Sequence, residues 1–129
     1  GVKCILISSA SNLSELPWWF RLKIPFYKLP TVLFKLTKTW VGPLFGTNNK
    51  QLIKSILKDT DPEFIKNAIR LIVNWTINRR GEVYRIHGDN DLIIPKPKVE
   101  TSTVHGGHLV IVDQAVEVSG FINQVLKVS

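Results

Sequence analysis

The sequence contains no methionine and a single cysteine, Cys4. One cysteine excludes an internal disulfide, and a free thiol fits a reducing compartment, so we expect a cytoplasmic location. The chain begins with Gly1 followed directly by an apolar run, with no starting methionine. We therefore expect these residues to be an internal or trimmed part of a longer protein.

The sequence also lacks a secretory leader, a membrane-spanning run and a concentrated patch of one charge. No basic segment with a cleavage pattern precedes the apolar start, and no apolar run approaches the ~18 residues that span a bilayer. Lys and Arg exceed Asp and Glu by 17 to 10, for a net charge of +7, but the cations are spread from Lys3 to Lys127. This spread favours a solvated basic surface over a nucleic-acid partner, and a membrane surface is only a lesser alternative.

What is present indicates one globular domain with alternating strands and helices. The chain has 129 residues, 44% hydrophobic and 21% charged, which is enough to bury a core. Asp61 as N-cap, Pro62 at the first helical position and Glu63 in the first turn predict a helix that ends near Arg79-Arg80-Gly81. Apolar runs predict strands at 2–8, 83–87 and 100–104, and helical spacing predicts further helices at 31–40, 50–58 and 114–127, the last capped by Asp113.

Helix-linked buried strands predict a mixed α/β fold with about three parallel strands. Two polar loops follow the second and third predicted strands: His87-Gly88-Asp89-Asn90-Asp91 and His105-Gly106-Gly107-His108. Ligands of such sheets bind beyond the carboxyl ends of the strands, so both loops should lie at the ligand-binding edge.

These loops resemble the acid and histidine loops of the α/β-hydrolase family. The acid loop of that family is similar to Gly-x-x-Asp-x-x-x-Pro, and its histidine loop has Gly-Gly-His ahead of an apolar run and an acidic residue. The matching residues here are Gly88, Asp91, Pro95, Gly106, Gly107, His108 and Asp113. The resemblance implies that 1–12 and 82–129 form the C-terminal part of a hydrolase core, with 13–81 as a helical cap or lid.

The resemblance further implies that Asp91 is the acid and His108 the general base of a catalytic triad. The parent protein would be a serine hydrolase that acts on a carboxylic ester or acyl compound with an apolar part. The nucleophile elbow Gly-x-Ser-x-Gly is missing, since Ser8, Ser9 and Ser11 lack its flanking glycines. We expect the elbow upstream of Gly1, which would make this fragment inactive alone.

The spacing and the neighbouring residues leave alternatives open. Asp91 and His108 are only 17 residues apart, so the crossover helix should be shortened or lost. Asp89 competes as the acid, while His105 is better explained as a loop residue and His87 as a strand-end residue. Together the loop histidines and carboxylates resemble metal ligands in type but not in spacing, so we expect no metal and no cofactor.

Aromatic residues are concentrated in the predicted cap and predict an apolar substrate pocket. The proposed pocket residues are Trp18, Trp19, Phe20, Phe34 and Trp40. The alternative is that they fill the core of a small cap. The expected partners are a small ester or acyl substrate and a second copy of the chain, because an unpaired first strand invites a homodimer. A non-catalytic binding module is the competing interpretation of the whole chain.

Overall fold

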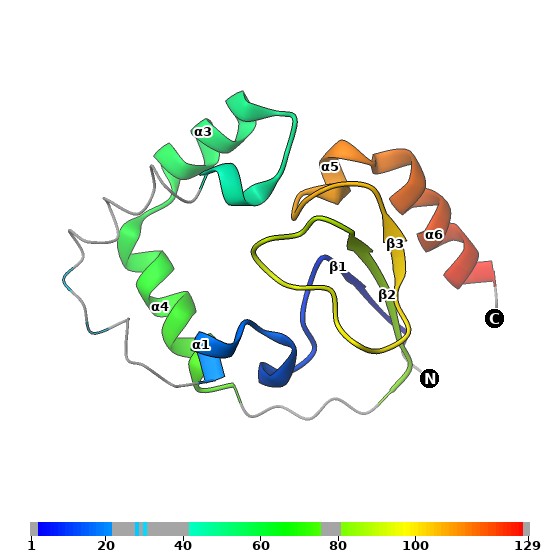
Figure 1. The fold of residues 1–129 in the computed structure, drawn as a ribbon, viewed down its shortest axis with the longest axis horizontal. Coiled ribbons are helices and arrows are strands. Elements are labelled where there is room, and N and C mark those ends of the chain that lie inside the picture. Colours follow the sequence, from blue (N-terminus) through cyan, green and yellow to red (C-terminus); the bar gives the residue numbers. More distant parts are fainter. Residues whose placement is uncertain (1–2, 22–27, 29, 31–41, 76–80, 128–129) are drawn as a thin grey trace.

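The computed structural model describes residues 3–21, 28, 30, 42–75 and 81–127 (Figure 1). Three strands, β1 (Cys4–Ile7), β2 (Val83–Gly88) and β3 (Ser102–Val104), form one sheet in the order β1-β2-β3. Both strand pairs are parallel. The predicted mixed α/β fold with parallel strands is therefore confirmed.

One face of the sheet carries the apolar core. Ile7 lies opposite Ile86 in the register, and Gly88 lies opposite Val104, so Ile7, Ile86 and Val104 point to the same side. Two helices at the C-terminal end, α5 (Val110–Asp113) and α6 (Ala115–Lys127), cover this side (Figure 1). Their contribution to the core is Val110, Val118, Phe121 and Ile122.

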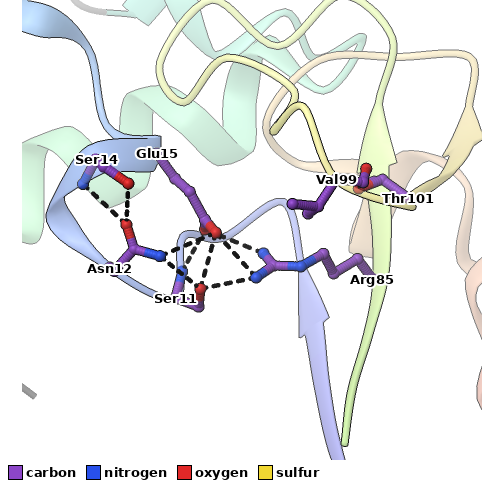
Figure 2. Close-up of polar contacts among 7 residues, drawn as sticks. All are labelled: Ser11, Asn12, Ser14, Glu15, Arg85, Val99 and Thr101. Atoms are coloured by element: carbon purple, nitrogen blue, oxygen red, sulfur yellow. Dashed lines mark hydrogen bonds and ion pairs between the residues drawn. The ribbon is translucent and has the colours of Figure 1, made fainter. Parts of the chain in front are cut away.

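The other face carries Arg85 and His87, and it is joined to the segment that follows β1. The Arg85 guanidinium lies 3.0 Å from Glu15 Oε1, and both side chains are almost fully buried. Ser11 donates from its backbone and from its hydroxyl to the same carboxylate, and Arg85 Nη2 donates to Ser11 Oγ (Figure 2). Burial acts to raise the Glu15 pKa, but the hydrogen bonds from Ser11 and Arg85 outweigh burial and lower it. The Glu15 carboxylate is thus ionised in the folded chain and is bonded to Arg85 of β2.

The long connection between β1 and β2 contains short helices whose starts follow from capping chemistry. Asn49 Oδ1 accepts from Leu52 N at the start of α3 (Lys50–Asp59), and Asp61 Oδ1 accepts from Glu63 N at the start of α4 (Pro62–Val73). The other helical elements described here are η1 (Leu13–Glu15), α1 (Trp18–Arg21) and the 3-10 helix η3 (Gly42–Phe45). In Figure 1, α3 and α4 lie on the far side of the sheet from α6.

The predicted end of the helix that begins at Asp61 is wrong. The helix α4 ends at Val73, not near Gly81, and the Asn74 side chain donates to the carbonyl of Arg70. This local side-chain bond competes with the helical pattern and ends it early. Phe64, in the first turn of α4, is 67% exposed.

The predicted final helix is also divided. The segment forms α5 and α6 with a break at Gln114, whose side chain donates to the carbonyl of His105. Asp113 does not begin the last helix, because it ends α5 and its Oδ1 accepts from Thr47 Oγ1 at 2.9 Å. This bond ties the loop before α3 to the segment that follows the histidine loop.

The connection from β2 to β3 contains no helix, as the short spacing predicted, and the strands are still parallel. The helix predicted at 31–40 lies outside the described residues. Among the helices of the described ranges, none has both the length and the apolar character needed to cross a bilayer.

Candidate functional site

Asp91 and His108 meet at the carboxyl edge of the sheet. Asp91 lies in the loop after β2, and His108 lies in the loop after β3. Because β2 and β3 are adjacent and parallel, their carboxyl ends deliver both loops to one place. His108 Nδ1 lies 2.8 Å from Asp91 Oδ2, with the Asp91 side chain fully buried and the His108 side chain 22% exposed.

The Asp91 carboxylate is held on both oxygens. Its Oδ1 accepts from the backbone amides of Ile93 and Ile94, each at 2.9 Å, in an Asx-type turn. Its Oδ2 faces two imidazoles, His108 Nδ1 at 2.8 Å and His87 Nε2 at 3.3 Å. The carboxylate therefore cannot rotate without breaking bonds on both sides.

This arrangement favours the ionised form of Asp91. Burial acts to raise its pKa, but the hydrogen bonds from His108, His87 and the Ile94 amide outweigh burial and hold the pKa well below its usual range. An ionised carboxylate only accepts hydrogen bonds, so His108 Nδ1 must carry the proton. In a neutral imidazole His108 Nε2 is then the nitrogen that can accept a proton, as a general base requires.

The connection between β1 and β2 fixes the backbone of His108. The His108 amide donates to the carbonyl of Phe45 at 2.8 Å, and the Phe45 ring meets the His108 imidazole edge-on with centroids 5.9 Å apart. Phe45 ends η3, so the loop that follows β3 packs against the end of this 3-10 helix. The sequence reasoning missed Phe45, because no local pattern shows which aromatic residue will reach the histidine loop.

Two glycines permit the close approach of the loops. A Cβ on Gly88 would lie 2.2 Å from the carbonyl oxygen of Gly107, and a Cβ on Gly107 would lie 2.3 Å from that of Phe45. These distances leave no room for a side chain at either position. The glycines thus let β2, the histidine loop and η3 pack backbone to backbone.

A second Asp–His pair joins the same two loops nearer to solvent. His105 Nδ1 lies 3.2 Å from Asp89 Oδ2, and Asp89 Oδ1 accepts from the amide of Gly106. The Gly106 bond is the main cause that lowers the Asp89 pKa, followed by His105. The His105 side chain is 83% exposed. Asp89, the competing acid, is therefore paired with His105, while Asp91 is paired with His108.

The serines after β1 are not hydrogen-bonded to His108. The Ser8 backbone has φ of 41°, and its buried Oγ has no hydrogen-bond partner among the described residues. Ser11 Oγ is engaged with Glu15 and Arg85. Neither the Ser8 nor the Ser11 hydroxyl is therefore hydrogen-bonded to the His108 imidazole.

The predicted aromatic pocket is only partly described. Trp18 and Phe20 lie on α1, which contacts η1 and α4, and the Trp18 side chain is 62% exposed. Phe34 and Trp40 lie outside the described residues, as does the side chain of Trp19. The aromatic residue that the described part does bring to His108 is Phe45.

Among the described residues, no group of three or more His, Cys, Asp or Glu side chains is arranged to hold a metal ion. Comparisons of the chain with protein-family models, with curated proteins and with solved structures found no match.

Proposed function

We propose that this chain supplies the acid and the base of a serine hydrolase of the α/β-hydrolase type. In this proposal Asp91 is the acid that orients the imidazole, and His108 is the general base that takes the proton of the nucleophile. The nucleophilic serine is supplied by a segment outside these 129 residues. The substrate is a carboxylic ester or related acyl compound with an apolar part.

The contact of 2.8 Å between His108 Nδ1 and Asp91 Oδ2 carries the proposal. A buried, ionised carboxylate on Nδ1 stabilises the imidazolium that forms when Nε2 accepts a proton. The partial exposure of His108 leaves the ring accessible from outside the described core.

A groove beside η3 supports an apolar substrate. Its volume is about 660 Å³, within the range of small-molecule sites. Its residues are Gly42, Pro43, Thr47, Lys50, Ile53, Lys54, Leu57 and Lys58. Three of these residues, Gly42, Pro43 and Thr47, lie within three residues of Phe45 in the sequence.

The proposal is tested by covalent labelling of the protein made from the complete gene. A fluorophosphonate probe reacts with a serine that is activated by a neighbouring base. We expect labelling of one serine within a Gly-x-Ser-x-Gly segment upstream of Gly1, no labelling of the 129-residue chain alone, and loss of labelling in His108→Ala. A complete protein without such a serine, or one that the probe does not label, would contradict the proposal.

A second candidate function is self-association through β1. The strand is apolar, and it ends the described sheet with a partner on β2 only, which leaves an edge that a second chain can extend. Sedimentation of the 129-residue chain should then show a homodimer. A monomer at high protein concentration would exclude this function.

A further inference from the structure

His87 is buried beside Asp91, and its contacts are more specific than those of a strand-end residue. It lies in β2 and is 1% exposed. Its Nε2 lies 2.8 Å from the carbonyl oxygen of Ile94 and 3.3 Å from Asp91 Oδ2. One ring nitrogen therefore contacts both the carboxylate and the far end of the acid loop.

The partners of His87 fix its protonation pattern. A carbonyl oxygen and an ionised carboxylate both accept hydrogen bonds and donate none. Nε2 must therefore carry a hydrogen, which it shares between Ile94 and Asp91. The tautomer is opposite to that of His108, whose hydrogen lies on Nδ1.

The bonds form a closed loop around the carboxylate. Asp91 Oδ1 accepts from the amide of Ile94, and the carbonyl of Ile94 accepts from His87. His87 in turn reaches Asp91 Oδ2, the oxygen that faces His108. A change in the position of the His87 ring would thus alter both the turn that holds Oδ1 and the partners of Oδ2.

We infer that His87 is the positioning residue of the Asp91–His108 pair: its Nε2–H holds the acid loop and directs Asp91 Oδ2 toward His108. The inference on catalysis rests on the proposed function, whereas the inference on geometry does not. His87 touches neither the reacting atoms nor the substrate in this account, and it acts through Asp91.

Two substitutions separate positioning from space filling. His87→Gln keeps a donor near the place of Nε2 but loses the ring, while His87→Phe keeps the ring but loses the donor. NMR of the 15N-labelled 129-residue chain follows the Nδ1 proton of His108. We expect exchange of this proton with water to be about tenfold faster in His87→Phe, the effect of one lost hydrogen bond to a charged group, and nearly unchanged in His87→Gln.

The opposite ranking, with Phe close to the unaltered protein and Gln strongly perturbed, would show that His87 only fills space and would overturn the inference. If His87→Phe does not fold, the 15N spectrum of the unaltered chain still decides, because the inference requires a proton on Nε2 of His87 at neutral pH. An Nε2 without a proton would overturn it.

The catalytic consequence has a separate readout in the complete protein. We expect kcat for ester hydrolysis to fall about tenfold or more in His87→Phe with little change in KM, and to recover in His87→Gln. A complete protein without any hydrolytic activity would contradict the proposed function alone. The NMR result on the 129-residue chain would still test the position of His87.

Discussion

At the scale of single residues, hydrogen bonds on both carboxylate oxygens of Asp91 fix the geometry of the site. Asp91 accepts from two backbone amides and faces two imidazoles. The backbone of the histidine loop is also tightly packed, since Gly107 lies directly against the carbonyl of Phe45. The geometry of the Asp91–His108 pair is therefore set by the packing of the loops as much as by the two side chains.

Gly107→Ala tests this packing. A Cβ there would lie 2.3 Å from the carbonyl oxygen of Phe45 and 2.6 Å from Gly46 Cα, so backbone atoms must shift. We expect a loss of about 1–3 kcal/mol in the free energy of unfolding, measured by urea denaturation. Gly120→Ala is the matched control, because a Cβ on this α6 residue meets nothing within 4 Å.

The control should be stabilised by about 0.5–1 kcal/mol, since alanine loses less conformational freedom than glycine in a helix. Equal effects of the two substitutions would show that the close approach of the loops does not limit the residue at position 107.

At the scale of elements, the buried pair of Glu15 and Arg85 fastens the segment after β1 to β2. Arg85 lies two residues before His87 on the same face of the strand. The pair therefore joins the start of the connection between β1 and β2 to the middle of β2 (Figure 2). Removal of one partner leaves a buried charge unpaired.

Arg85→Met should lower the free energy of unfolding by about 2 kcal/mol, the typical value for hydrogen bonds to a charged group. The matched control is Lys66→Met, which removes an ion pair 3.4 Å long between more exposed side chains, Lys66 and Glu63. Such surface pairs contribute at most about 1 kcal/mol. A loss in Arg85→Met no greater than that in Lys66→Met would show that the pair does not hold the segment after β1 on β2.

Much of the element order follows from sequence patterns, but the ends of elements do not. Capping side chains at Asn49 and Asp61 predict where α3 and α4 begin, because the cap bonds to backbone groups two or three residues away. The end of α4 depends on Asn74, and the break before α6 accompanies a bond between Gln114 and His105. The Gln114–His105 bond forms only once the histidine loop is in place, so the periodicity of the sequence cannot show it.

At the scale of the whole molecule, the site is made by sheet topology. Two loops that follow adjacent parallel strands must come together, which is why the meeting of Asp91 and His108 could be expected from sequence. Phe45 and His87 could not be assigned in this way. The contact of Phe45 depends on how the connection between β1 and β2 packs on the histidine loop, and the role of His87 depends on where the Ile94 carbonyl lies.

The fold as a whole should lose stability in acid. Asp91 and Glu15 have lower pKa values in the folded chain than their ordinary values. Their stabilising contribution is therefore present above the unfolded values, about 3.9 and 4.3, and is lost as pH falls toward the folded values. We expect urea denaturation to show a falling free energy of unfolding from about pH 5 downward.

Asp91→Asn should reduce the slope of the free energy of unfolding against pH by up to about 1.4 kcal/mol per pH unit, which corresponds to the uptake of one proton. Identical slopes for the variant and the unaltered chain between pH 5 and pH 2 would contradict the assignment of Asp91 as a carboxylate that is ionised in the fold and neutralised in acid.

The most direct test of the proposed chemistry compares the two histidines that follow β3. Both pair with an aspartate of the acid loop, His108 with Asp91 and His105 with Asp89. The measurement is kcat/KM for hydrolysis of an acyl ester by the protein made from the complete gene. We predict a loss of roughly a thousandfold or more in His108→Gln, as for a lost triad member, and near-normal activity in His105→Gln. Equal activity of the two variants, or a greater loss in His105→Gln, would contradict the account.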